Sequence, residues 1–264
     1  MAPFQLTILG AGPAAPNAGG ACSGYLLQQD GTAALIDCGS GVAGRLAEHL
    51  QPNRLRGIAI SHFHPDHYFD LVPLYYSLKF GEPRPPDLEP LVPLYVPPGG
   101  RTFLRTLGAL ISDKQAMLED VFQVSEYAPG RETPIGDLSF TFHPVQHYVP
   151  SHAMRVRGSS GKTLVFSSDV APCPELVEAA RDADLFMCES ALRDASEDEA
   201  DPAKRGHMCA REAGDIARRA GVRKLMLTHY RSTKKLDAHH REAASGTFGG
   251  PVELAKEGRC YEVC

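Results

Sequence analysis

The cluster of ionisable side chains that follows residues 57–61 restricts the fold more than any other feature of the sequence. Residues 57–61 are mostly apolar and predict a short buried strand, and the next six residues are His62-Phe63-His64-Pro65-Asp66-His67. Because side chains two apart on a strand point the same way, we expect His62 and His64 to face one ion. Pro65 would end the strand and turn the chain, so that the following carboxylate and imidazole face a second ion. A surface histidine cluster on a turn is the competing interpretation, and the buried strand before it argues against that.

Further ligands are expected where other buried strands leave the core, because one short cluster cannot complete two ion sites. Three ionisable residues follow apolar runs within two residues: His147 after residues 138–145, Asp169 after residues 163–167, and His229 after residues 224–228. Imidazole and carboxylate groups suit zinc, manganese or iron(II) and disfavour a soft thiolate site. Together with the first cluster, these residues predict a site for two divalent metal ions.

The pattern of apolar runs predicts one α/β domain over residues 1–264, with no repeat and no clear linker. Strands are expected at residues 4–10, 21–27, 33–37, 57–61, 91–96, 121–127, 138–145, 163–167, 185–188 and 224–228. Helices are expected at residues 42–50, 71–80, 101–110, 174–181 and 210–220. Seven prolines between residues 83 and 98 exclude a helix there, and five acidic residues at 194–201 predict a solvated loop.

Composition and charge exclude several classes of protein. Apolar residues make up 43% and charged residues 22% of the chain, which is typical of a globular protein rather than a disordered one. The net charge of −5 gives no general attraction to nucleic acid or to an anionic membrane. No apolar run approaches the roughly 20 residues of a membrane span, and the N-terminus lacks the features of a signal peptide. With seven cysteines and no Cys-x-x-Cys pair, free thiols in the cytoplasm are expected.

The chain resembles the metallo-β-lactamase superfamily over nearly its whole length. Four residues match the His-x-His-x-Asp-His signature and three more fall in the order of the later motifs: His62, His64, Asp66, His67, His147, Asp169 and His229. The resemblance implies a four-layer αββα sandwich with two metal ions at one edge. It assigns three ligands to one ion, namely His62, His64 and His147. It assigns three to the other, namely Asp66, His67 and His229. Asp169 would bridge the ions, and Asp37 would orient ligands without binding.

Within the superfamily, the chain is most similar to the ribonuclease Z-like branch. The segments that carry this similarity are Phe166-Ser167-Ser168-Asp169-Val170, Cys188-Glu189-Ser190-Ala191, Gly206-His207-Met208 and Leu227-Thr228-His229. Cys188 departs from the branch, which has histidine at that position. His147 and Asp169 are only 22 positions apart, which leaves no room for the long arm that ribonuclease Z uses to grip tRNA. Small bacterial cyclic-nucleotide phosphodiesterases of the superfamily share this compact form.

The resemblance also assigns catalytic roles at the predicted metal site. Two close cations make a water molecule acidic enough to act as a nucleophile near neutral pH, and Asp66 would accept its proton. His207 matches the proton donor of the branch and is the candidate general acid for the leaving alkoxide, a solvated loop histidine being the alternative. Glu189 would orient His207 or a metal ligand by hydrogen bonding. The alternative for Glu189 is a carboxylate at the edge of the core that pairs with an arginine.

The predicted function is hydrolysis at a binuclear metal site, with zinc expected first and manganese or iron as alternatives. The favoured reaction is phosphodiester hydrolysis of a small or cyclic nucleotide. The alternatives are a ribonuclease Z-type endoribonuclease acting on RNA and a hydrolase of a lactone, thioester or sulfate ester. His152 and Arg155 are candidates for phosphate contact, although Arg155 also fits an exposed strand position. A homodimer is expected, and the aromatic helix at 71–80 favours a core or subunit contact over a base-stacking surface.

Overall fold

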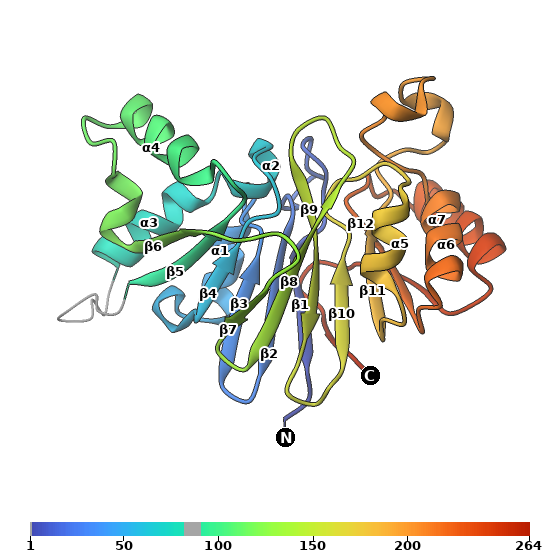
Figure 1. The fold of residues 1–264 in the computed structure, drawn as a ribbon, viewed down its shortest axis with the longest axis horizontal. Coiled ribbons are helices and arrows are strands. Elements are labelled where there is room, and N and C mark those ends of the chain that lie inside the picture. The colour runs from blue at the N-terminus through green and yellow to red at the C-terminus, as the bar shows by residue number, and fades with distance from the viewer. Residues whose placement is uncertain (1, 82–90) are drawn as a thin grey trace.

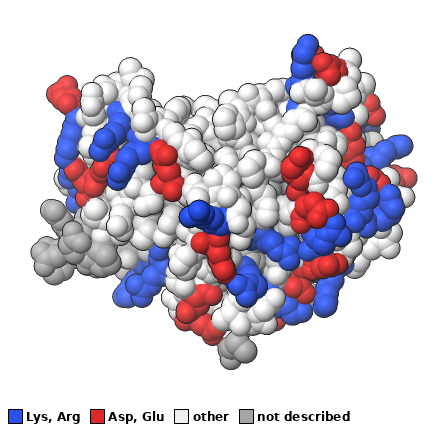
Figure 2. Space-filling view, in the orientation of Figure 1, with Lys and Arg blue, Asp and Glu red and all other residues white. Residues whose placement is uncertain are grey.

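The computed structural model describes residues 2–81 and 91–264, which form two sheets of seven strands each (Figure 1). The first sheet is ordered β14 (Cys260–Glu262), β1 (Gln5–Gly10), β2 (Gly24–Gln29), β3 (Thr32–Ile36), β4 (Gly57–Ala59), β5 (Val92–Val96) and β6 (Phe122–Glu126). The second is ordered β13 (Val252–Leu254), β12 (Leu225–Thr228), β11 (Leu185–Glu189), β10 (Thr163–Phe166), β9 (Ser151–Arg157), β8 (Leu138–Val145) and β7 (Glu132–Ile135). Of the proline-rich stretch, residues 82–90 lie outside the described residues, and the strand predicted at 91–96 is confirmed as β5. In the same orientation, the upper edge of the surface is hollowed and carries few charged side chains (Figure 2).

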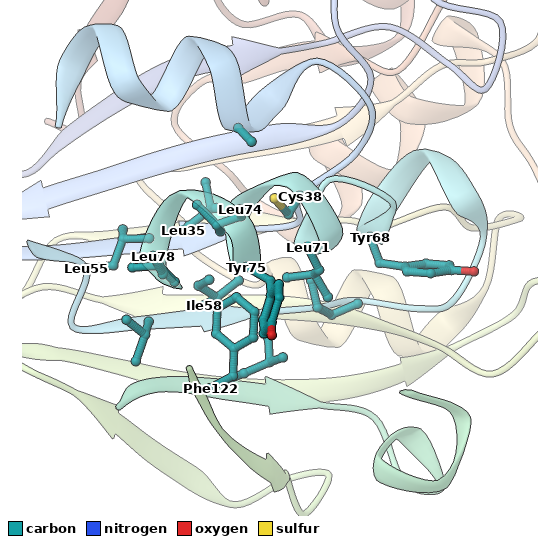
Figure 3. Packing of buried hydrophobic residues seen from close by; sticks show 14 of the residues in the cluster. Leu35, Cys38, Leu55, Ile58, Tyr68, Leu71, Leu74, Tyr75, Leu78 and Phe122 are labelled. Carbon is teal, nitrogen blue, oxygen red and sulfur yellow. The ribbon is translucent and has the colours of Figure 1, made fainter. Parts of the chain in front are cut away.

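Three groups of buried apolar side chains define the layers. One group lies between the two sheets and includes Phe140 and Phe166. A second packs the first sheet against helices α1 (Val42–His49), α3 (Leu71–Phe80) and α4 (Gly100–Ile111) (Figure 3). A third packs the second sheet against helices α5 (Pro174–Ala180), α6 (Ala210–Ala220) and α7 (Lys234–Phe248). Helices therefore cover the outer face of each sheet, which confirms the predicted four-layer αββα sandwich (Figure 1).

Alternating side-chain direction lets one central strand serve two cores. In β10, Leu164 and Phe166 belong to the core between the sheets, whereas Val165 belongs to the core under the outer helices. β11 repeats this pattern, with Met187 between the sheets and Phe186 under the helices. Because successive side chains point to opposite faces, a strand buried on both faces reads as a continuous apolar run. This is why the sequence predicted these strands.

Sequence reasoning missed helix α7 and the strands β7, β9, β13 and β14. The sequence of α7 is mostly polar, and only His240, Ala244 and Phe248 are buried. The helix approaches α6 closely, because a side-chain atom added at Gly214 would lie 2.2 Å from Thr247 Oγ1. Three of the missed strands, β7, β13 and β14, have only three or four residues. In β9 charged side chains interrupt the apolar residues, although Met154 and Val156 lie in the core between the sheets. All four strands pair with neighbours. β9, for example, is paired on both sides, with β8 and with β10.

Two further observations concern the helices and the cysteines. None of the helices in residues 2–81 and 91–264 is both long and apolar enough to cross a membrane. All seven cysteines have free thiols, of which Cys260 and Cys264 are exposed. The single domain over residues 1–264 and the cytoplasmic location stay predictions.

Truncating a side chain between the sheets should cost far more stability than truncating an exposed aromatic residue. The exposed fraction is 0% for Phe140 and 62% for Phe80. We expect Phe140→Ala to lower the free energy of unfolding by about 3–5 kcal/mol, because it removes buried contacts and leaves a cavity. Phe80→Ala should change it by no more than roughly 0.5 kcal/mol. Urea unfolding followed by circular dichroism measures both, and equal losses would contradict the position of Phe140 in the inner core.

Candidate metal centre

Strand direction brings the predicted site residues to one edge of the sandwich. β10, β11 and β12 are parallel, and β8 runs the same way because β8 and β10 are both antiparallel to β9. The ionisable residues at the ends of these four strands are His147, Asp169, Glu189 and His229. In the first sheet β3 and β4 are parallel, and Asp37 and the cluster at 62–67 follow their ends. Residues far apart in sequence therefore leave the two sheets at the same place.

The first histidine cluster is built differently from the prediction. β4 ends at Ala59, so His62 and His64 lie in the loop that precedes α2 (Pro65–Tyr68), not on a strand. Pro65 occupies the first turn of α2, where its missing N–H costs no hydrogen bond. The Tyr127 hydroxyl donates to a backbone carbonyl of the loop at 3.2 Å. The imidazoles converge because hydrogen bonds fix the loop, not because side chains alternate along a strand. The prediction that His62 and His64 lie on a strand is therefore wrong.

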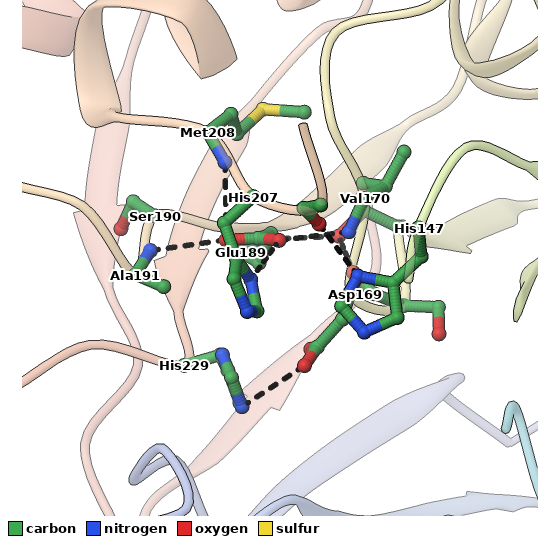
Figure 4. A network of polar contacts seen from close by, with 12 residues as sticks. His147, Asp169, Val170, Glu189, Ser190, Ala191, His207, Met208 and His229 are labelled. Carbon is green, nitrogen blue, oxygen red and sulfur yellow. Dashed lines mark hydrogen bonds and ion pairs between the residues drawn. The ribbon is translucent and has the colours of Figure 1, made fainter. Parts of the chain in front are cut away.

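All seven predicted ligand residues lie in two adjoining groups. The first group consists of His62, His64, His147 and Asp169, and the second of Asp66, His67, Asp169 and His229. Within each group the candidate ligand atoms lie within 4.8 Å of one another. His64 Nδ1 and His147 Nε2 are 3.0 Å apart. Asp169 belongs to both groups and lies between His147 and His229 (Figure 4).

The unpaired polar atoms of the cluster fit a divalent cation. Among the described residues, His62 Nε2, His67 Nε2 and Asp169 Oδ1 are buried without a hydrogen-bond partner. Unpaired buried polar atoms are costly, and a cation between them would supply the missing partner. Burial lowers the pKa of His62 and brings the pKa of His147 down to about 4, so both imidazoles are neutral at pH 7 and offer lone pairs. The cluster is compatible with a divalent metal site.

Asp37 supports the second group from behind. It is fully buried and has a φ of 55°, a left-handed conformation that aspartate adopts more readily than most residues. Its Oδ2 accepts hydrogen bonds from His67 Nδ1 at 2.7 Å and from Ser61 Oγ at 2.8 Å, and its Oδ1 accepts from the Ser61 N–H at 2.7 Å. With Nδ1 of His67 engaged as a donor, its Nε2 faces Asp66 and Asp169. This arrangement is typical of a residue that orients a metal-binding histidine.

A second buried carboxylate, Glu189, holds His207 beside the cluster (Figure 4). Glu189 Oε1 accepts hydrogen bonds from His207 Nδ1 at 2.9 Å and from the Val170 N–H at 2.7 Å. Its Oε2 accepts from the Ala191 N–H at 3.0 Å. The alternative that Glu189 pairs with an arginine is therefore wrong, because its partners are a histidine and backbone amides.

The surroundings of His207 differ from those of a solvated loop histidine. Its ring centroid lies 5.0 Å from that of His147 and 5.9 Å from that of His229. Burial disfavours the charged ring, but the carboxylates of Glu189 and Asp169 outweigh this and raise the pKa of His207 to about 9. The imidazole is thus protonated at pH 7 and lies beside the candidate ligands.

The structure places the two predicted phosphate contacts elsewhere. Arg155 Nη1 donates to the carbonyls of Ala179 and Arg181, both at 2.9 Å, at the C-terminal end of α5. The prediction that Arg155 contacts phosphate is wrong, because the carbonyls that end a helix attract its positive charge. His152 is buried and packs edge-on against Tyr127, with ring centroids 5.2 Å apart. It belongs to neither ligand group.

Sequence reasoning missed Tyr148 and Asp198. The ring centroid of Tyr148 lies 5.0 Å from that of His147 and 5.6 Å from that of His207. Asp198 lies in the acidic run that predicted a solvated loop, yet its Oδ2 accepts from the His207 N–H at 3.0 Å. The position of Tyr148 next to a ligand candidate was an available signal. Nothing in the sequence distinguishes Asp198 from the other acidic residues of its run.

A four-layer αββα sandwich with a His/Asp cluster at one edge defines the metallo-β-lactamase class of fold. Residues 32–230 match the family model described as the beta-lactamase superfamily domain. The chain belongs to this family, which confirms the resemblance seen in its sequence motifs.

Proteins similar to this chain include a probable metallo-hydrolase and a ribonuclease Z. The uncharacterized protein ML1173 of Mycobacterium leprae is 32% identical over 263 residues, which cover 98% of this chain and 88% of the relative. The probable metallo-hydrolase YhfI of Bacillus subtilis is 30% identical over 259 residues, 98% of this chain and 100% of the relative. The crystal structure of YhfI matches with a TM-score of 0.84 at 27% identity, covering 99% of this chain and 100% of that chain. Ribonuclease Z of Myxococcus xanthus is 26% identical in an alignment of 311 residues, which covers 100% of this chain and 99% of the relative.

Removing the carboxylate behind His67 should weaken metal binding. We expect Asp37→Asn to lower divalent-metal affinity about 10–100-fold, because the asparagine cannot accept all three hydrogen bonds and His67 loses its orienting partner. Asp113→Asn removes the same charge at an exposed position and should leave the affinity unchanged. Competition with a chromophoric chelator measures both variants. An unchanged affinity in Asp37→Asn would contradict the orienting role.

Proposed function

We propose that the chain is a metal-dependent phosphodiesterase that hydrolyses small or cyclic nucleotides at a site for two divalent ions. The observation that carries this proposal is that two ligand groups sharing Asp169 adjoin a third group formed by Glu189, His207 and His229. Phosphodiester cleavage needs stabilisation of the charge that builds on phosphorus and a proton for the leaving oxygen. Two cation sites with a protonated imidazole beside them supply both requirements.

The side chains divide this chemistry between them. When bound, two divalent ions, for which we propose zinc, supply a nucleophilic water and stabilise negative charge on phosphorus. The first would be held by His62, His64 and His147, and the second by Asp66, His67 and His229, with Asp169 between them. Asp66 accepts the proton of the attacking water. His207 keeps its Nδ1 on Glu189 and presents the proton on its Nε2 to the leaving oxygen.

The build and charge of the chain support a small substrate. Most of the 22 positions from His147 to Asp169 are taken up by β9, β10 and the turn that joins them. In Figure 2 the Lys and Arg side chains lie over the left, central, right and lower parts of the face, and few lie along the hollowed upper edge. Long RNA gains affinity from many contacts between phosphates and Lys or Arg, so this edge favours a short anion.

A ribonuclease Z-type endoribonuclease is the second candidate. It is favoured by the 26% identity with ribonuclease Z of Myxococcus xanthus over 100% of this chain. The homodimer and the cytoplasmic location belong to the proposal as well.

Relative turnover of small and large substrates tests the function directly. We expect kcat/KM of the metal-loaded protein to be higher for a cyclic nucleotide than for a tRNA precursor in the same buffer. The physical reason is that a largely uncharged edge makes few phosphate contacts with a long polyanion. Efficient cleavage at a fixed position on the 3′ side of the tRNA would overturn this preference and favour the second candidate.

The metal content of the purified protein should approach two equivalents per chain. Asp169→Ala should lower the occupancy of both sites, because Asp169 belongs to both ligand groups. Asp66→Ala is the matched control, since Asp66 belongs to the second group only and should lower one site. Inductively coupled plasma mass spectrometry measures all three proteins. One ion per chain, unchanged in Asp169→Ala, would rule out the binuclear site.

Replacing His207 should slow turnover more than it changes metal content. A general acid typically contributes about 10²–10⁴ in rate, and we expect His207→Ala to lose that much on a cyclic nucleotide. The loss should be smaller on bis(p-nitrophenyl) phosphate, because nitrophenolate leaves without a proton. His239→Ala, a histidine on α7, is the matched control. Equal losses on the two substrates would remove His207 from this role.

A further inference from the structure

Three consecutive residues beside the candidate metal centre hold the segment that carries His207. Gln146 Nε2 donates to the Pro202 carbonyl at 2.6 Å and to the Arg205 carbonyl at 3.1 Å. His147 Nδ1 donates to the Gly206 carbonyl at 2.6 Å. The Tyr148 ring packs on the α-carbon of Gly206 so closely that an added side-chain atom would lie 2.4 Å from it. The segment before His207 is therefore fixed at the carbonyls of residues 202, 205 and 206 and at the α-carbon of Gly206.

Asp198, which lies in the same segment as His207, makes further contacts that fix the backbone of His207. Its Oδ2 accepts from the Gly206 N–H at 2.9 Å and from the His207 N–H at 3.0 Å. Its Oδ1 accepts from the Tyr148 hydroxyl at 2.5 Å. One carboxylate thus binds the backbone of His207 and the side chain that packs on Gly206. The backbone of His207 is held by Asp198 and its ring by Glu189, which fixes both ends of the residue.

We propose that Asp198 is a positioning residue for His207, fixing its backbone so that the imidazole stays aligned beside the candidate metal ligands. This inference rests on the proposed function, because it assigns Asp198 to the placement of the general acid. A general acid must lie within hydrogen-bond reach of the leaving oxygen, and a displacement of about 1 Å can cost on the order of 10²-fold in rate. Without Asp198 the N–H groups of Gly206 and His207 lose their acceptor. The contacts that remain on this backbone hold its carbonyls, with His147 Nδ1 on Gly206 at 2.6 Å and Arg205 Nη2 on His207 at 3.2 Å.

The same contacts link His207 to a candidate ligand. In the peptide group between Gly206 and His207, the N–H donates to Asp198 and the carbonyl accepts from His147 Nδ1. The other ring nitrogen of His147, Nε2, faces His64. Asp198 therefore acts on a peptide that also fixes the ring orientation of His147. The effect on His147 is expected to be smaller than on His207, because His147 is held by its own strand end as well.

The test compares Asp198→Ala with two matched variants. Asp198→Asn keeps oxygen and amide groups at the same position and should rescue, since its oxygen can still accept from the two backbone N–H groups. Glu199→Ala removes the neighbouring exposed acid and serves as the control for charge. For each variant we would measure kcat and KM on a cyclic nucleotide and on bis(p-nitrophenyl) phosphate, together with metal content and circular dichroism.

We expect Asp198→Ala to lower kcat on the cyclic nucleotide on the order of 10²-fold. KM should change little, and the aryl ester, which needs no proton, should lose far less. Asp198→Asn and Glu199→Ala should stay close to the wild type. Equal losses on both substrates, a loss explained by released metal, or an Asp198→Ala variant that behaves like Glu199→Ala would each overturn the inference.

A second readout separates this inference from the proposed function. The Nδ1 proton of His207, shared with Glu189, is identified in the proton NMR spectrum by its absence in His207→Ala. This signal should persist in Glu199→Ala and Asp198→Asn, and it should broaden or shift in Asp198→Ala. Wild-type protein that hydrolyses neither phosphodiester would overturn the proposed function, and the proton signal would still decide the positioning role. A signal unchanged in Asp198→Ala would overturn that role.

Discussion

The burial of Asp169 between two groups of imidazoles is the constraint on which the rest of the site depends. Its exposed fraction is only 2%, and burial alone would raise the pKa of its carboxyl. The charges of His229 and His67 outweigh burial and keep the pKa well below its usual value. An ionised carboxylate in such a place is stable only if its partners stay where they are. The protein therefore needs a scaffold that holds these side chains in place and keeps water away from the buried carboxylate.

The sandwich provides this scaffold because two of the strands that precede candidate ligands are packed on both faces. β10 and β12 contribute alternate side chains to the core between the sheets and to the core under the outer helices. A strand held in this way cannot rotate or slide without disturbing two cores, so its end is a rigid platform. Asp169 and His229 follow such ends. The loop that carries His62 and His64 does not lie at the end of such a strand. Hydrogen bonds with Asp37 and Tyr127 fix this loop instead.

Much of this could be predicted from the sequence, and the exceptions have physical reasons. The strands buried on both faces were predicted, and so was the position of the candidate ligands just after them, since apolar runs and the residues that end them are local signals. Helix α7 was missed because it is polar and is stabilised by close contact with α6. The strand assignment of His62 was wrong because the chain leaves the sheet at Ala59, which local composition does not show. Asp198 was interpreted as a solvated acid because its partners, Tyr148 and Gly206, meet it only in the folded chain.

Under the proposed function, the acidic run at 194–201 would bear on both the alignment of His207 and the size of the substrate. Asp198 alone in this run binds the backbone of His207, whereas Glu199 and Asp201 are exposed. These exposed carboxylates are borne by the same segment that carries His207 to the site, so they repel a long polyanion that would lie across it. A small phosphodiester carries one negative charge, which would face the cations, and it would place little negative charge near the acidic segment. Under the proposed function, the carboxylate that aligns His207 and the charges that disfavour long RNA would thus lie on one stretch of chain.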